Sequence, residues 1–220
     1  MPFISTMSSR KAPGWCVPAH LRAQETPSSV DTHGDDSHTP MKGIIFTEFL
    51  DMVEQRFSLP VLDQILVAAQ LPSEGAYTAV GTYDHGEIWR LVCELSTVTE
   101  IPVPQLLRAY GEYLFPRLVA AHPNLLQGMR SAFDLLQSLD GVIHREVGKL
   151  YPDAELPRFE VVERSGERMT LIYESSRPFA DLAEGLIRAC GAHFGESVSV
   201  TRDNLPAGNG VRVRFTLTLQ

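Results

Sequence analysis

The run Tyr173-Glu174-Ser175-Ser176-Arg177 carries side chains that suit the binding of carboxylates. If residues 173–177 are extended, alternate side chains share a face, so Tyr173, Ser175 and Arg177 point the same way. That face offers two hydroxyl groups and one guanidinium fork. Together these groups can satisfy carboxylates that would otherwise be costly to bury. The run therefore predicts a site for a pair of carboxylates.

A second candidate is His144, which falls at the edge of the apolar stripe of a helix expected over residues 125–151. At 100 degrees per residue, the stripe is formed by Met129, Phe133, Leu136, Ile143, Val147 and Leu150. The imidazole can therefore point into an apolar cavity while its backbone stays helical.

Two glycines flank this histidine, Gly141 and Gly148. Each costs about 1 kcal/mol relative to alanine in a helix interior, and close approach of something bulky and flat would explain both. The alternative is a histidine at the core boundary, bonded to water or to Asp140 four residues earlier, with the glycines merely tolerated. Periodicity alone leaves both interpretations open.

The elements that must position these residues change type along the chain. From Ile44 to Tyr151, apolar residues recur three and four positions apart, which is the helical period. Asp84 followed by Glu87 predicts a capping box at the start of one helix. After Pro123 we expect one long helix over residues 125–151.

Beyond Pro157 the apolar period becomes two, which predicts strands. The expected strands cover residues 158–164, 168–175, 197–202 and 211–219, with a helix starting near Pro178 between the two hairpins. The predicted fold class is α+β, with an N-terminal helical subdomain packed on a C-terminal antiparallel four-stranded sheet with helices.

Composition limits the classes of partner and compartment. The formal net charge is −8 and no basic patch is visible, which disfavours nucleic acid. The chain has no run of about 18 apolar residues and no apolar stretch typical of a signal peptide, so we expect a cytoplasmic protein without a membrane span. Residues 1–40 are rich in Ser, Thr, Pro and Asp and predict a disordered extension, followed by one domain over residues 41–220.

Several motifs in a specific order carry a family resemblance. They are Met41-Lys42-Gly43-Ile44-Ile45, Ala76-Tyr77-Thr78-Ala79-Val80-Gly81-Thr82-Tyr83, Val142-Ile143-His144-Arg145-Glu146-Val147, Lys149-Leu150-Tyr151, Pro157 and Tyr173-x-Ser175-x-Arg177. Together they resemble the H-NOX family, the haem nitric oxide/oxygen-binding domains, and particularly its bacterial stand-alone members. The resemblance covers nearly all of residues 41–219.

The resemblance implies a b-type haem that lies between the helices and the sheet and is held without covalent attachment. His144 would be the proximal ligand of the haem iron, and Tyr173, Ser175 and Arg177 would bind the propionates, in agreement with the carboxylate site inferred above. Pro157 matches a family proline that presses against the porphyrin. Its alternative role is the rigid end of a loop.

On the gas-binding side, the resemblance implies a distal pocket lined by Ile45, Phe49, Leu182 and Leu186, all of them apolar. Family members that hold dioxygen have a tyrosine at the position of Leu182. Dioxygen bound to iron gains from a hydrogen-bond donor, whereas nitric oxide and carbon monoxide depend on one much less. We therefore expect a nitric oxide sensor that excludes dioxygen. The alternative is that another donor reaches the iron, for which the candidates are Tyr77, Tyr83, Tyr110 and Tyr113.

No nucleotide-binding loop or nucleophile triad is recognisable, so we expect no enzyme activity and an output that passes to a separate protein. In similar family members that protein is a histidine kinase or a cyclic-di-GMP enzyme. Two rival functions remain: a haem-free module of the same fold that binds an apolar small molecule, and a haem enzyme such as a peroxidase. The peroxidase is disfavoured because the predicted distal wall offers no acid or base.

Overall fold

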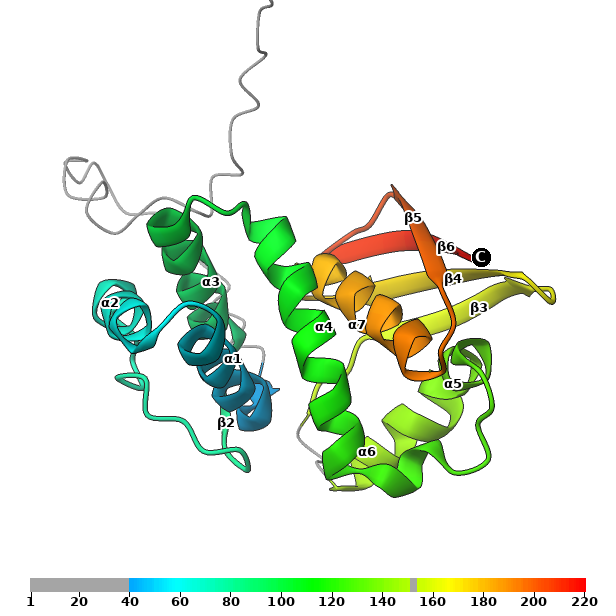
Figure 1. Ribbon diagram of the computed structural model, residues 1–220, viewed down its shortest axis with the longest axis horizontal. Coiled ribbons are helices and arrows are strands. Elements are labelled where there is room, and N and C mark those ends of the chain that lie inside the picture. The colour runs from blue at the N-terminus through cyan, green and yellow to red at the C-terminus, as the bar shows by residue number, and fades with distance from the viewer. Residues whose placement is uncertain (1–39, 151–153) are drawn as a thin grey trace, which may run out of the picture.

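The computed structural model describes residues 40–150 and 154–220 (Figure 1). The extension predicted over residues 1–40 lies outside the described residues, except for Pro40, which begins the first strand. Within the described ranges, no helix is both long and apolar enough to cross a bilayer.

Four helices form the N-terminal half, as the helical period predicts. They are α1 (Gly43–Arg56), α2 (Leu59–Ala69), α3 (His85–Thr99) and α4 (Val103–Ala121). Their apolar faces meet in one core, in which Phe46, Ile65 and Leu91 are fully buried.

The sequence did not predict a small antiparallel pair of strands, β1 (Pro40–Lys42) and β2 (Thr82–Asp84). The capping prediction at Asp84 is half right. Its carboxylate accepts a hydrogen bond from the backbone N–H of Gly86 at 2.8 Å and caps α3. Glu87 does not complete the capping box, because its carboxylate accepts hydrogen bonds from Ser73 and Tyr77 instead.

The single helix expected over residues 125–151 is wrong. A short 3-10 helix, η2 (Pro123–Leu126), comes first, and α5 (Ala132–Ser138) begins only after a turn. The turn contains Gly128 at φ +83°, a conformation that glycine adopts at little cost. Ser131 caps α5 by accepting from the N–H of Asp134 at 3.1 Å. A π-helical turn, η3 (Leu139–Ile143), then separates α5 from α6 (His144–Leu150).

The C-terminal half agrees with the prediction. Its elements are β3 (Arg158–Arg164), β4 (Arg168–Ser175), α7 (Ala180–His193), β5 (Val198–Asn204) and β6 (Val211–Leu219). The four strands form one antiparallel sheet in the order β3-β4-β6-β5. Helix α7 crosses one face of this sheet (Figure 1) and packs on Val213, Phe215 and Leu217. The α+β fold class is confirmed.

Helices α4 and α7 join the two halves, and they approach each other very closely (Figure 1). A Cβ atom on Gly185 would lie 2.1 Å from the carbonyl oxygen of Arg108. A Cβ atom on Gly111 would lie 2.4 Å from the carbonyl oxygen of Leu182. Only glycine fits at these two positions, because the backbones themselves are in contact.

Replacing Gly185 by alanine should therefore push α7 away from α4. We expect the free energy of unfolding to fall by about 1–3 kcal/mol, as in overpacked cores, measured by urea denaturation. Gly166→Ala is the control, since a Cβ atom there meets no atom within 4 Å. An unchanged midpoint for Gly185→Ala would contradict the close packing of the helices.

Candidate functional site

A large apolar cavity lies between the two halves of the molecule and encloses about 310 Å³. We call it the main cavity. Its walls come from β1, α1, α4, the 123–147 region, the loop before β3, β4 and α7. Its lining includes Met41, Ile44, Ile45, Leu114, Leu118, Val119, Leu136, Ile143, His144, Val147, Pro157, Phe159, Tyr173, Ser175, Arg177, Leu182, Leu186 and Ile187.

His144 lines the main cavity and is held by Asp140. Its Nδ1 lies 2.9 Å from Oδ1 of Asp140. This is the contact with Asp140 that the alternative interpretation of His144 predicted. The other carboxylate oxygen of Asp140 accepts from the backbone N–H of Phe159 on β3 at 2.9 Å. When Nδ1 donates to Asp140, Nε2 keeps its lone pair, which is the arrangement typical of a histidine that ligates a metal.

The π-helical turn brings this pair into place. The backbone N–H of His144 donates to the carbonyl of Leu139, five residues earlier, so one extra residue is inserted before the histidine. Asp140 and His144, four apart, then form their side-chain contact across the junction of the π-helix and α6. Such π-turns occur frequently at functional sites.

Burial lowers the pKa of His144, and the nearby Asp140 carboxylate offsets this only in part. The imidazole is therefore neutral at pH 7. A neutral imidazole is the form that binds a metal.

Arg177 is a buried cation with unused hydrogen-bonding capacity. One terminal nitrogen, Nη2, donates to the carbonyls of Pro40 at 2.8 Å and Glu155 at 2.9 Å. Its Nε is buried and has no hydrogen-bond partner among the described residues. Burial lowers the pKa of Arg177. A buried guanidinium with an unpaired N–H is a binding group for an anion.

Tyr173 and Ser175 lie beside Arg177 on the cavity wall. The Ser175 hydroxyl oxygen accepts from the backbone N–H of Arg177 at 3.1 Å, which leaves its own hydrogen available to an acceptor. The ring of Tyr173 packs edge-on against Phe159 at 5.2 Å between centroids, and Phe159 lies 5.9 Å from the His144 ring. The structure thus brings the predicted carboxylate site and the histidine to one cavity. Pro157 also lines it.

Three of the four predicted distal residues, Ile45, Leu182 and Leu186, line the main cavity. Phe49 is not among its lining residues. It lies one turn beyond Ile45 on α1, is fully buried in the helical core, and packs edge-on against Tyr110 at 5.2 Å. Ile45 and Phe49 share one face of α1, but only the N-terminal end of this helix borders the cavity, so Ile45 lines it and Phe49 packs in the core beyond it.

The four tyrosines considered as alternative donors do not line the main cavity. The hydroxyl of Tyr110 donates to the carbonyl of Ile45, and that of Tyr77 donates to Glu87 at 2.8 Å. The hydroxyl of Tyr83 accepts from the N–H of Thr78 at 2.9 Å. The ring of Tyr113 is covered by Arg117 at 3.3 Å.

Sequence reasoning missed several lining residues. Leu114 and Leu118 are four apart on α4 and line the cavity. The helical period indicates that they share a face of the helix, but not that this face borders the cavity. Cys190 and His122 also line the cavity. Burial raises the pKa of the Cys190 thiol to about 12, so it is neutral and uncharged at pH 7. Nothing in the sequence around His122 distinguishes it from a surface histidine.

Comparison with known proteins decides the family. The model of a family described as Haem-NO-binding matches residues 42–202. The chain belongs to the H-NOX family. An unliganded Fe(II) H-NOX protein from K. algicida is 39% identical to this chain, with a TM-score of 0.78, over 82% of this chain and 97% of that one. The comparison with curated proteins gave no match.

Two further H-NOX structures resemble this one. The H-NOX from Shewanella woodyi, solved with IWP-051 bound in the Fe(II)CO ligation state, is 41% identical, with a TM-score of 0.69, over 81% of this chain and 94% of that one. The H-NOX protein from S. oneidensis in the Fe(II)NO ligation state is 26% identical, with a TM-score of 0.74, over 82% and 99%. Membership of this family supports a haem-based gas sensor.

The residues of the H-NOX cavity fit a haem. The neutral His144 has a nitrogen lone pair that can bind a metal. The buried Nε of Arg177, which has no partner among the described residues, can donate a hydrogen bond to an anion. The rest of the lining is almost entirely apolar, which suits the flat and largely apolar ring system of a porphyrin. Neither Gly141, which is exposed, nor Gly148 is among the lining residues of the cavity, so its geometry does not support the explanation of these glycines by close approach of a flat group.

The lowered pKa of His144 predicts a pH dependence of stability in the haem-free H-NOX protein. Because the pKa of His144 in the folded protein lies below the ordinary histidine value of 6.5, the unfolded chain binds more protons than the folded chain as the pH falls through that value. The free energy of unfolding should therefore decrease between pH 7.5 and pH 5.5. In His144→Gln, which keeps a donor for Asp140 but does not titrate, urea denaturation should show a smaller decrease. An equal decrease in both proteins would contradict the shift.

Proposed function

We propose that this H-NOX protein is a ferrous-haem sensor of nitric oxide, which also binds carbon monoxide, excludes dioxygen and signals to a separate partner. The observation that carries the proposal is the position of His144, Tyr173, Ser175 and Arg177 on one apolar cavity. The histidine and the anion-binding groups are thereby joined in a single site. Residues 41–220 would form the haem-binding domain.

His144 would hold the iron of a b-type haem through Nε2, while Asp140 fixes the orientation of its ring. Arg177, Tyr173 and Ser175 would bind the two propionates. When bound, the ferrous haem supplies an open coordination position for a diatomic gas. Pro157, at the end of the loop before β3, would contact the porphyrin face.

Gas selectivity would follow from the wall formed by Ile45, Leu182 and Leu186, which has no hydrogen-bond donor in its side chains. Dioxygen held by a ferrous haem would depend on such a donor, whereas nitric oxide would not. The tyrosine hydroxyls are engaged elsewhere or lie outside the cavity, as described above, which supports this selectivity.

The response would begin at His144. The ring of His144, which would hold the iron, is bonded to Asp140, whose other oxygen accepts from the N–H of Phe159. Displacement of α6 would therefore act on β3 and, through it, on the sheet. Such a shift between the helical half and the sheet is a change of shape that a partner can read. A histidine kinase or a cyclic-di-GMP enzyme in the cytoplasm is the proposed partner.

Replacing His144 by glycine should abolish haem retention. We expect the Soret band of the purified protein to disappear and to return when imidazole fills the vacated space. His122→Gly is the matched control, because His122 is another histidine of the same cavity wall, and it should retain the Soret band. Retention of five-coordinate histidine-type haem by His144→Gly would overturn the ligand assignment. A wild-type protein without any Soret band would instead favour the haem-free apolar binding module.

Exposing the ferrous protein to air should produce no stable oxy spectrum. Leu182→Tyr should introduce a donor and strengthen dioxygen binding by about 10- to 100-fold, the value of a hydrogen bond to a charged group. Leu182→Phe is the control, since it adds the ring without the hydroxyl. A stable oxy spectrum in the wild type, or equal dioxygen binding by the Tyr and Phe variants, would contradict the proposed basis of selectivity.

A further inference from the structure

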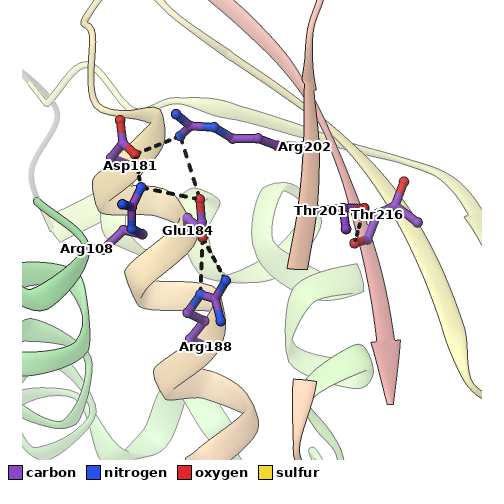
Figure 2. A network of polar contacts seen from close by, with 7 residues as sticks. All are labelled: Arg108, Asp181, Glu184, Arg188, Thr201, Arg202 and Thr216. Carbon is purple, nitrogen blue, oxygen red and sulfur yellow. Dashed lines mark hydrogen bonds and ion pairs between the residues drawn. The ribbon is translucent and has the colours of Figure 1, made fainter. Parts of the chain in front are cut away.

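A cluster of charged side chains lies along α7 (Figure 2). Leu182 and Leu186 of the same helix line the main cavity. We call Arg108, Asp181, Glu184, Arg188 and Arg202 the α7 cluster. The two acidic side chains are largely buried, with 15% of Asp181 and 9% of Glu184 exposed. Ion pairs that are partly removed from water are worth more than surface pairs, and their loss leaves charges poorly solvated.

The acidic groups of the α7 cluster are shared among the arginines. Oδ1 of Asp181 accepts hydrogen bonds from Nη1 of Arg108 and, at 2.8 Å, from Nη1 of Arg202. Oε2 of Glu184 lies 3.9 Å from Nη1 of Arg108 and 3.6 Å from Nη1 of Arg202. The other oxygen of Glu184 accepts from Nη2 of Arg188 at 2.9 Å and from its Nε at 3.2 Å.

The three arginines come from three different elements (Figure 2). Arg108 belongs to α4, in the helical half of the molecule, and Arg202 belongs to β5 in the sheet. Arg188 belongs to α7 itself, one turn beyond Glu184. Within the α7 cluster, Arg108 is therefore the member that connects α7 to the helical half.

The backbone of Arg108 meets α7 at the same place. Its carbonyl oxygen lies 2.1 Å from the position that a Cβ atom of Gly185 would occupy. At this contact the two helices meet through their backbones, so the contacts of neighbouring side chains fix where α4 stands along α7. The side chain of Arg108, bonded to Asp181 one turn away from Gly185, is one of these contacts.

We propose that Arg108 is a positioning residue for the gas-binding wall. By pairing with Asp181 and Glu184 it keeps α7 in register with α4, and so sets where Leu182 and Leu186 stand in the main cavity. This inference rests on the proposed function. If Arg108 moves away, Asp181 still pairs with Arg202, and Glu184 still pairs with Arg188. The register of α7 on α4 can therefore change without leaving a buried carboxylate that has no cation beside it.

The test compares Arg108→Gln with Arg188→Gln in the haem-loaded protein. Both variants remove one positive charge from the α7 cluster, but only the first removes a bond between helices. After photolysis of the carbon monoxide complex, Arg108→Gln should rebind the gas at a rate that differs from the wild type by about 3-fold or more, while Arg188→Gln should not. Arg108→Lys, which retains a cation that reaches Asp181, should restore most of the wild-type rate.

Hydrogen exchange supplies a second readout that does not depend on gas binding. The amides of α7 around Leu182 should exchange faster in Arg108→Gln than in Arg188→Gln. Equal rebinding rates and equal exchange in the two variants would overturn the role of Arg108, even if the protein binds haem and carbon monoxide as proposed. Absence of a Soret band in the wild type would overturn the proposed function, and with it the gas-binding role, while the exchange data would still report whether Arg108 holds α7.

Discussion

The site depends on the carboxylate of Asp140, because its two oxygens bind two different elements. One accepts from the imidazole of His144 and the other from the backbone of Phe159 on β3. The first bond sets the tautomer and leaves one ring nitrogen available, as for metal-ligating histidines in general. The second joins the turn before His144 to the edge strand of the sheet. The proposed response relies on this connection between the histidine and β3.

The wall of the cavity that α7 forms is constrained by its packing. Leu182 packs in the core of the helical half, Ala183 and Ile187 pack in the core of the sheet half, and Leu186 touches both. Helix α7 is therefore shared between two cores, and glycines on both helices let it contact α4 backbone to backbone. Because the cores are close-packed, a small displacement of α7 must be accommodated in both of them. The wall that is proposed to bind the gas therefore lies at the boundary between the two halves.

Structural features that depend on residues near one another in the sequence could be predicted, whereas features that depend on distant residues could not. The strands were predictable because strands seven to nine residues long show the period of two, whereas β1 and β2 have three residues each and no period to detect. The π-helical turn was missed because Leu136 and Ile143, seven residues apart, fit the stripe of an uninterrupted α-helix and give no sign of the extra residue. Phe49 was expected at the cavity from its position in the motif, which does not show that only the N-terminal end of α1 reaches the cavity. The pairing of Arg108 with Asp181, 73 residues apart, has no local signal at all.

The bond between Arg177 and the carbonyl of Pro40 joins residues 137 positions apart. During synthesis from the N-terminus, this bond cannot form until nearly the whole helical half and the first hairpin of the sheet have been made. The same guanidinium also ties down the loop at Glu155. Helix α7, which carries Leu182 and Leu186, is synthesised later still. The cavity therefore acquires its last wall only after the residues that Arg177 binds have all been made.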